Sequence, residues 1–292
     1  MELLFKILLI LILFFIAVMI IDCNRFVVRR YQCASPKIRK DTTVILLSDL
    51  HGKSYGKENE KLVKAIRQEA PDLILCAGDL YTSVKGGSTQ SAVTLLQKLS
   101  REYPVFCGNG NHEQKTKLYP ETYGGMYQEY AAELQKMGAV QLVNEKAGLP
   151  ERGMELYGLE IGRGYYRKGK RLSMEPEYLT ELLGKPDPYR YNILIAHNPD
   201  YFKAYEEWGA DLVLSGHVHG GLMRLPFLGG VISPAMRLFP EYDGGLFMKG
   251  NAKMVLGRGL GTHTLPIRIF NPGELVVIRL KGGKYRKGRK RK

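Results

Sequence analysis

The 292-residue sequence contains only four cysteines, Cys23, Cys33, Cys76 and Cys107, and their spacing matches no metal-binding pattern. This excludes a metal domain built from cysteine pairs. Cys76 and Cys107 each end a short apolar run, where cysteine usually behaves as a small apolar residue. Cys23 and Cys33 could form a disulfide if the chain is exported, whereas reduced cysteines fit a cytoplasmic setting.

The middle of the sequence also lacks internal repeats and low-complexity linkers. A layered α/β domain readily occupies about 240 residues as one unit. We therefore expect a single domain over residues 42–280. The stretch 216–273 is rich in Gly and Pro, and this composition favours looped, β-rich structure that closes a site, not a linker between domains.

Acidic residues are few beside basic ones, 29 against 43, which gives a formal net charge of +14. The excess lies at the two ends. Six Lys and Arg residues occur in 23–41 and eight in 281–292, so the part between them is nearly neutral. We interpret 23–41 as a basic juxtamembrane linker and 281–292 as a basic disordered tail. Such segments attract anionic lipid head groups, although a basic tail can also bind nucleic acid or simply be disordered.

The N-terminus carries the one long apolar run, Leu3 to Ile21, interrupted only by Lys6. Its 19 residues nearly suffice to cross a bilayer, which predicts a transmembrane anchor over 1–22. A cleaved signal peptide is the alternative, but Glu2 lies beside Lys6 and no Ala-x-Ala-like site follows. Because Lys and Arg gather after the run, the rule that basic residues stay inside predicts a cytoplasmic domain in a single-pass cell-membrane protein. An extracytoplasmic domain is the alternative.

Five of the six histidines lie in short motifs that place imidazole beside carboxylate or amide. With a related Gly-Asp motif, these are Asp49-Leu-His51, Gly78-Asp79-Leu80, Gly110-Asn111-His112-Glu113, Ala196-His197-Asn198-Pro199 and Gly216-His217-Val218-His219. Oxygen and imidazole ligands together suit Mn²⁺, Fe²⁺ and Zn²⁺, and the ligands are numerous enough for two ions. The sixth histidine, His263, is interpreted as a surface residue, with a substrate-facing role as the alternative.

Each motif follows a short apolar run that predicts a buried strand: 44–47, 73–76, 105–107, 193–196 and 212–214. Helix-like segments lie between several of them, at about 57–69, 88–102, 121–136 and 199–208. Alternating strands and helices indicate an α/β fold, in which ligands gather at the carboxyl ends of the strands. We therefore expect the five motifs to converge on one rim.

The spacing inside the motifs has a physical reason. In an extended segment, Asp49 and His51 would point to the same side and could reach one ion, and His217 and His219 repeat this spacing. Asp79 could bridge two cations through its two carboxylate oxygens. Two ions roughly 3.5–4 Å apart stabilise both the attacking and the leaving oxygen of a phosphoryl transfer.

The series of motifs resembles the calcineurin-like metallophosphoesterase family over roughly residues 42–280. The segments 220–226, 258–261 and 265–268 resemble its membrane-associated YaeI/YkuE-like branch. The resemblance implies a four-layer αββα metallophosphoesterase sandwich, here preceded by one transmembrane helix. It also implies two divalent ions, Mn²⁺, Fe²⁺ or Zn²⁺, with Mn²⁺ favoured.

The resemblance further assigns roles to single residues. One metal would be bound by Asp49, His51, Asp79 and His219, and the other by Asp79, Asn111, His197 and His217. His112 would face the substrate and protonate the leaving oxygen. Glu113 is expected to accept hydrogen bonds behind the ligands and not to act as a base. Arg268 is a candidate contact for a substrate phosphate, or a surface arginine.

These residues together imply a membrane-anchored phosphoesterase that hydrolyses a phosphodiester, a phosphomonoester or a pyrophosphate. A lipid-linked or nucleotide-lipid substrate such as UDP-diacylglucosamine would fit an anchored domain with basic flanks. The alternatives are a metal-dependent nuclease and a non-catalytic scaffold with the same fold. The nearly neutral middle of the chain argues against nucleic-acid binding, and the presence of every ligand argues against a scaffold.

Overall fold

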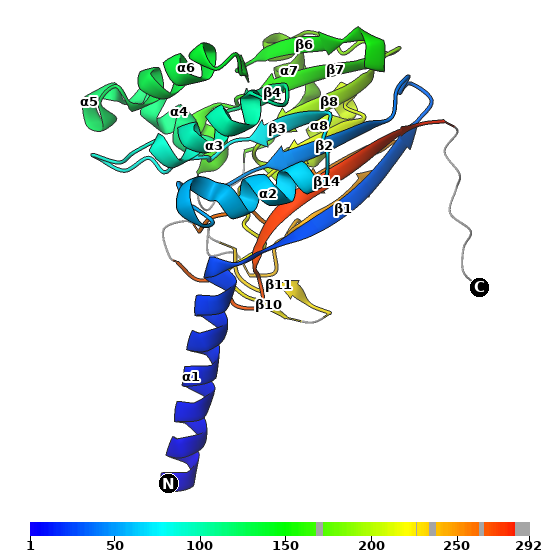
Figure 1. Ribbon diagram of the computed structural model, residues 1–292. Helices are drawn as coiled ribbons and strands as arrows, with labels where there is room; N and C mark the ends of the chain where they lie inside the picture. The colour runs from blue at the N-terminus through cyan, green and yellow to red at the C-terminus, as the bar shows by residue number, and fades with distance from the viewer. Residues whose placement is uncertain (168–171, 226, 234–237, 263–265, 284–292) are drawn as a thin grey trace, which may run out of the picture.

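The computed structural model describes residues 1–167, 172–225, 227–233, 238–262 and 266–283. His263 and residues 284–292 lie outside the described residues, and so does the expectation of a disordered tail beyond residue 283. The described chain forms two six-stranded sheets, a short two-stranded hairpin and helices that flank the sheets (Figure 1).

The first sheet has the strand order β1-β14-β2-β3-β4-β5. β2, β3, β4 and β5 are parallel to one another, β14 is antiparallel to β2, and β1 is parallel to β14. The bounds are β1 Phe26–Ser35, β2 Thr42–Leu47, β3 Leu73–Ala77, β4 Val105–Gly108, β5 Val140–Leu142 and β14 Gly273–Gly282.

The second sheet has the order β12-β13-β9-β8-β7-β6, with antiparallel strands at both edges and parallel strands between them. Its strands are β6 Glu145–Leu149, β7 Met154–Leu159, β8 Tyr191–Ala196, β9 Leu212–Ser215, β12 Gly245–Lys249 and β13 Ala252–Leu256. The separate hairpin pairs β10 Arg224–Leu225 with β11 Gly229–Gly230.

Helices cover the outer faces of both sheets. On the first sheet these are α2 Glu60–Gln68, α3 Gln90–Ser100 and α6 Met126–Lys136, and on the second α7 Pro176–Leu183 and α8 Phe202–Trp208. The remaining helices are α1 Glu2–Asn24, α4 Asn111–Leu118 and α5 Pro120–Tyr123, with 3-10 turns η1 Lys57–Asn59, η2 Pro150–Arg152, η3 Arg163–Tyr166 and η4 Pro199–Tyr201.

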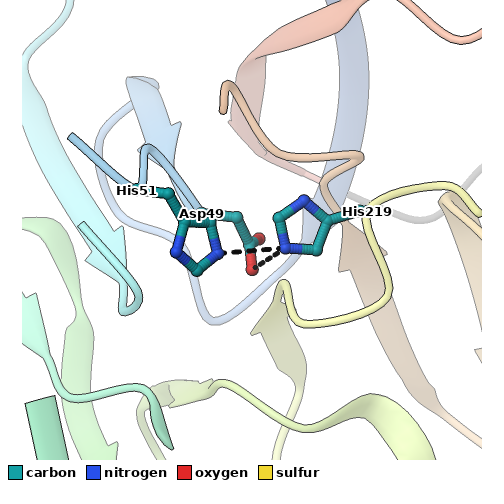
Figure 2. Close-up of side chains that lie close together, drawn as sticks. All are labelled: Asp49, His51 and His219. Atoms are coloured by element: carbon teal, nitrogen blue, oxygen red, sulfur yellow. Dashed lines mark hydrogen bonds and ion pairs between the residues drawn. The ribbon is translucent and has the colours of Figure 1, made fainter. Parts of the chain in front are cut away.

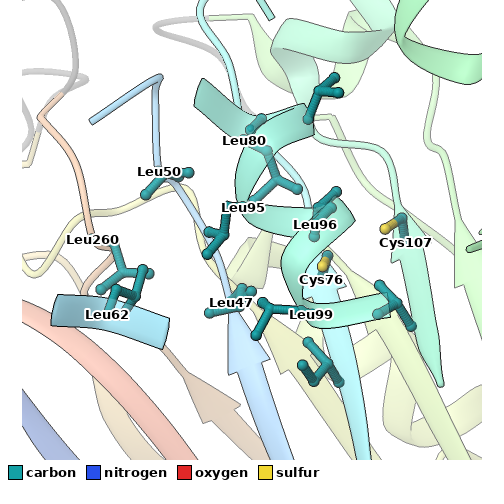
Figure 3. Packing of buried hydrophobic residues seen from close by; sticks show 14 of the residues in the cluster. Leu47, Leu50, Leu62, Cys76, Leu80, Leu95, Leu96, Leu99, Cys107 and Leu260 are labelled. Atoms are coloured by element: carbon teal, nitrogen blue, oxygen red, sulfur yellow. The ribbon is translucent and has the colours of Figure 1, made fainter. Parts of the chain in front are cut away.

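Apolar residues on both faces of the central strands produce the layering. Along β2, Ile45 and Leu47 face the helix layer, whereas Val44 and Leu46 pack against the second sheet. A strand buried on both faces must be apolar throughout, which explains the unbroken apolar runs in the sequence. Figure 3 shows the outer cluster, where Leu95, Leu96 and Leu99 of α3 lie over the sheet. The expected four-layer αββα sandwich is confirmed.

Helix α1 projects from the domain as a continuous 23-residue helix (Figure 1). By length and composition it could cross a membrane, and none of its most apolar window is buried. A signal sequence passes the same test. A buried core helix is excluded for this segment, because its leucines and isoleucines are largely exposed.

The structure differs from the sequence interpretation in residues 23–41. This stretch was expected to be a linker, but Phe26–Ser35 form strand β1, paired in parallel with β14 over ten residues. Phe26 and Val28 pack against the core, while the guanidinium groups of Arg29 and Arg30 stay half-exposed. A strand at the edge of a sheet tolerates such charges, because part of it stays in contact with solvent. Likewise β14 runs to Gly282, two residues into the expected tail.

All four cysteines are free thiols. Cys76 and Cys107 face each other in register on β3 and β4, fully buried, as expected of small apolar residues. Cys33 is also buried within β1, whereas Cys23 near the end of α1 is partly exposed. A Cys23–Cys33 disulfide is therefore absent from this structure.

Candidate metal centre

The motif-bearing strands belong to both sheets, so the single rim expected from the sequence is in fact two rims that meet. β2, β3 and β4 come from the first sheet, and β8 and β9 from the second. Contacts to backbone atoms help to join the rims: the backbone N–H of His217 donates to Asp49 Oδ1 at 2.9 Å, and His197 Nδ1 lies 2.6 Å from the carbonyl oxygen of Ala77.

One group of side chains combines Asp49, His51 and His219 (Figure 2). The Nε2 atoms of the two histidines lie 3.1 Å apart with their rings stacked, and His219 Nε2 is 3.4 Å from Asp49 Oδ1. Two imidazole nitrogens and a carboxylate oxygen that point at one another are a normal ligand arrangement for a borderline divalent ion.

A second group combines Asp79, His197 and His217. His197 Nε2 lies 3.0 Å from Asp79 Oδ2, and the His197 and His217 rings are 5.2 Å apart. Since the Ala77 carbonyl can only accept, His197 must carry a proton on Nδ1. In the neutral ring this leaves the Nε2 lone pair for a metal, as in many metal-binding histidines.

Asp79 lies between the two groups. Its Oδ2 is 3.0 Å from His197 Nε2 on one side and 3.9 Å from His51 Nε2 on the other. Its Oδ1 accepts the backbone N–H of His112 at 2.9 Å. A bridge through both oxygens was expected, whereas here one oxygen faces both groups and the other is held by the backbone.

The backbone at these residues is left-handed and not extended. The φ angles are 50° at Asp49, 48° at His51, 53° at Asp79, 75° at His217 and 54° at His219. The argument from extended-strand alternation was therefore wrong, although the side chains do meet. Non-glycine residues rarely adopt this region, and they cluster at functional sites when they do.

Glycines permit the close approach of the loops. A Cβ on Gly78 would lie 2.1 Å from the backbone nitrogen of Gly110, and one on Gly216 would lie 2.2 Å from Asp49 Oδ2. Any larger residue at these positions would push apart the loops that hold the carboxylates.

Among the buried polar atoms of the described residues that lack a hydrogen-bond partner, two are oxygens of this site: Asp49 Oδ2 and Asn111 Oδ1. Leaving such an oxygen buried and unpaired is costly, so each oxygen requires an explanation. A metal ion supplies one, because both oxygens belong to residues expected to be ligands. The donor set therefore fits divalent ions.

The electrostatics of these side chains follow from burial and proximity. Burial raises the pKa of Asp49 to about 6, and the neighbouring Asp79 carboxylate adds to this rise. Burial acts in the same direction on Asp79, but the nearby imidazoles of His197 and His112 outweigh it and hold the pKa of Asp79 well below its usual range. Burial lowers the pKa of His197, yet Asp79 and Asp49 outweigh this and raise the pKa to about 10. The cluster is thus built to hold positive charge.

His112, near the start of α4, is buried, with its Nε2 4.0 Å from Asp79 Oδ2. Its Nδ1 accepts the backbone N–H of Ser83 at 2.9 Å and lies 2.8 Å from Ser83 Oγ. Because a backbone N–H can only donate, this contact requires a lone pair on Nδ1 and places the ring proton on Nε2.

Glu113 accepts three backbone N–H groups, from Asp79, Leu80 and Gly110, at 2.8–2.9 Å. Burial raises the pKa of Glu113 to about 7. Because its oxygens are taken up by the loop that carries Asp79, Glu113 acts as the expected hydrogen-bond acceptor behind the ligands.

The structure contradicts one of the two sequence interpretations of Arg268. Arg268 is buried, so it is not a surface arginine, and its guanidinium donates to the carbonyl oxygens of Arg258, Gly259, Gly261 and Asn271. These contacts hold two loops together. The motif around Arg268 was assigned from resemblance, which could not reveal its burial.

Sequence reasoning missed two residues of η3. Arg163 Nη1 donates to the carbonyl oxygen of Asn111 at 3.1 Å, and the Tyr166 ring lies 5.4 Å from that of His217. Their only sequence signal is the Gly162-Arg163-Gly164-Tyr165-Tyr166 run, which contains no metal ligand. Arg163 therefore places a cation beside the backbone of Asn111, a candidate ligand.

Comparison with known proteins agrees with this geometry. Residues 42–221 match the sequence profile of the calcineurin-like phosphoesterase family. The chain is 27% identical over 251 residues to the uncharacterized metallophosphoesterase YkuE of Bacillus subtilis, covering 82% of this chain and 78% of that protein. It is also 27% identical to the phosphodiesterase YaeI of Escherichia coli over 229 residues, covering 75% of each.

Some relatives are longer. An uncharacterized metallophosphoesterase of Campylobacter jejuni is 28% identical over 257 residues, and the match covers 85% of this chain but 62% of that protein.

Proposed function

The chain belongs to the calcineurin-like phosphoesterase family, a family of metal-dependent hydrolases, and from this premise we propose a membrane-anchored phosphoesterase with two divalent ions. Asp49, His51, Asp79 and His219 would bind one ion, and Asp79, Asn111, His197 and His217 the other. The supporting observation is the position of Asp79 Oδ2 between the two groups of imidazoles. Mn²⁺, Fe²⁺ and Zn²⁺ all suit this mixture of oxygen and nitrogen donors, and Mn²⁺ is favoured by the resemblance to the family.

When bound, such ions neutralise phosphoryl oxygens and make a water molecule acidic enough to attack at neutral pH. The protein contributes orientation and proton transfer. Ser83 fixes the His112 ring, whose Nε2 would face the leaving oxygen and donate a proton to it. Glu113 keeps Asp79 in place through the loop backbone.

A substrate screen tests the reaction. We expect the purified chain to hydrolyse at least one class among phosphomonoesters, phosphodiesters and pyrophosphates. EDTA should abolish hydrolysis and added Mn²⁺ should restore it. Cleavage of DNA with a steep salt dependence of binding would favour a nuclease instead. Bound metal without hydrolysis of any class would favour a scaffold.

We expect Arg163→Ala to lower kcat/KM by roughly 10- to 100-fold, because a hydrogen bond to a charged group contributes about 1.5–3 kcal/mol. The guanidinium would contact a non-bridging phosphate oxygen of the substrate. Steady-state kinetics on the best substrate measures the effect. Arg167→Ala is the matched control, since Arg167 lies four residues away and is exposed. Equal effects of the two substitutions on kcat/KM would show that Arg163 does not contact the substrate.

The membrane part of the proposal depends on α1. A retained anchor with Arg25, Arg29 and Arg30 after it places the domain in the cytoplasm. A C-terminal reporter that works only in the cytoplasm should then be active, and one that works only outside should be silent. Neutral residues at the three arginines should weaken this preference. A strong exterior signal from the unmodified chain would place the domain, and its substrate, outside the membrane.

An anchored domain with basic flanks suits an amphiphilic substrate, such as a nucleotide-lipid of the UDP-diacylglucosamine type. In the same screen, phosphate esters of lipids should be better substrates than their water-soluble analogues.

A further inference from the structure

One surface of the domain exposes apolar side chains around the hairpin β10–β11. Among the described residues outside α1, every exposed phenylalanine lies here, and the Phe227 side chain is fully exposed. We call this the hairpin surface. It consists of Leu225, Phe227, Leu228, Leu238, Phe239 and Phe270. Single exposed apolar residues are common, but a contiguous patch indicates an interaction site.

Backbone contacts join the three chain segments that carry these side chains into one surface. Met223 pairs with Ile269 as a parallel bridge, which joins the hairpin to the segment carrying Phe270. The backbone N–H of Phe239 donates to the carbonyl oxygen of Val231 at 2.9 Å, which brings the third segment alongside.

The hairpin surface lies beside α1. The Phe270 ring is 6.4 Å from that of Phe14 and 6.3 Å from that of Phe15, in the middle of the helix. Phe14 precedes Ile21, the end of the apolar run, by seven residues, or about 10 Å at 1.5 Å per residue. If α1 crosses a bilayer, Phe270 lies below the head groups. Figure 1 shows β10 and β11 at the end of the domain from which α1 projects.

Strand directions explain this placement. β14 is antiparallel to β2 and parallel to β1, so the start of β1 lies at the edge where β2 ends. The metal-binding motifs follow the ends of β2, β3 and β4 at that same edge. Helix α1 therefore leaves the domain on the side of the metal centre.

Hydrogen bonds hold the helix to that side. Asp22, at the end of α1, is buried, accepts the backbone N–H of Asn271 at 2.9 Å and pairs with Arg25. The Asn271 side chain in turn donates to the carbonyl oxygen of His219 at 2.7 Å. Asp22 and Asn271 thus connect α1 to the candidate metal ligand His219. The depth at which α1 lies in the bilayer therefore also sets the depth of the domain.

Three aromatic residues of the surface have left-handed backbones: φ is 65° at Phe227, 45° at Phe239 and 53° at Phe270. Bulky residues rarely adopt this conformation, and its occurrence at all three indicates a functional reason for presenting these rings to the exterior.

We propose that the hairpin surface inserts into the bilayer beside α1 and holds the metal centre at the lipid–water interface. The inference rests on the membrane anchor of the proposed function. The occupant of the surface is the lipid bilayer, since the surface continues the apolar side of a membrane helix. Arg25 and Lys53 contact Asp22 and Asn24 at the end of α1, the level at which anionic head groups would meet the chain if α1 crosses a bilayer. The substrate class is a phosphate ester carried by an amphiphile in the same membrane.

Fluorescence quenching tests the proposal in the full chain. Phe227→Trp, Phe239→Trp and Phe14→Trp are each reconstituted into phosphatidylcholine–phosphatidylglycerol vesicles with bromine on the acyl chains. Native Trp208 is buried in the second sheet's helix layer and gives a constant background. Tyr189→Trp is the matched control, because Tyr189 is 87% exposed and precedes β8 at the opposite edge. Hydrolysis of the best water-soluble substrate from the screen checks that each variant is folded.

We expect the added emission of the Phe14, Phe227 and Phe239 variants to be quenched and that of the Tyr189 variant to persist. Quenching at Phe14 without quenching at Phe227 and Phe239 would overturn the proposal and leave the anchor intact. No quenching at Phe14 would overturn the membrane anchor and this proposal together, while the phosphoesterase activity would be judged separately by hydrolysis. Quenching at Tyr189 equal to that at Phe227 would also contradict the proposal, since the contact would not be specific to one surface.

Discussion

Asp79→Ala should leave the purified protein without either divalent ion and without measurable hydrolysis. Asp79 Oδ2 is the one oxygen that faces both groups of imidazoles, so its loss removes a ligand from each ion. It also removes the negative charge that offsets His51, His112 and His197 in a buried site. Elemental analysis after dialysis measures the effect.

His219→Ala is the matched comparison. His219 belongs to the group with Asp49 and His51 and not to the group with His197. It should weaken mainly one ion and leave the other bound. Circular dichroism on both variants separates metal loss from unfolding. A full complement of metal in Asp79→Ala would show that Asp79 is not shared.

His112→Ala should lower kcat by roughly 10²–10⁴, the usual contribution of a positioned acid, with metal content unchanged. The loss should be smaller for p-nitrophenyl esters than for alkyl esters, because p-nitrophenolate leaves with little need of a proton. Steady-state kinetics on such a series measures the difference.

A loss of the same size for good and poor leaving groups would contradict proton donation by His112. It would leave His112 the role of stabilising charge or of orienting the substrate.

The layered fold and the grouping of the candidate ligands could be predicted because their signals are local. Each central strand is buried on both faces and is therefore apolar throughout, as at 44–47. Each ends at a polar turn that carries a candidate ligand. The pairing of the strands into two sheets could not be read from these runs, because sheet membership depends on contacts between distant segments.

Strand β1 was missed for a similar reason. Its arginines resembled a charged flank of a membrane helix, and its partner β14 lies almost 250 residues later. The pattern that identifies it is the spacing of Phe26 and Val28, which face the core on one side of an edge strand. Two apolar residues at alternate positions identify a strand only when the strand that pairs with them is known.

Arg268 and Arg163 show which site residues cannot be placed from the sequence alone. Arg268 was selected by resemblance, yet the loops fold so that backbone carbonyls surround it. Arg163 has no motif and reaches the centre only because η3 lies beside the start of α4. Ligand types can be recognised from sequence, whereas the positions of long flexible side chains depend on packing.

The most direct test of the central claim is the metal content of the purified full-length chain, measured together with its hydrolytic activity. The account predicts two divalent ions per chain, activity that falls to zero as EDTA removes them, and recovery on addition of Mn²⁺. One ion or none in the active protein, or hydrolysis that persists after complete removal of metal, would contradict it.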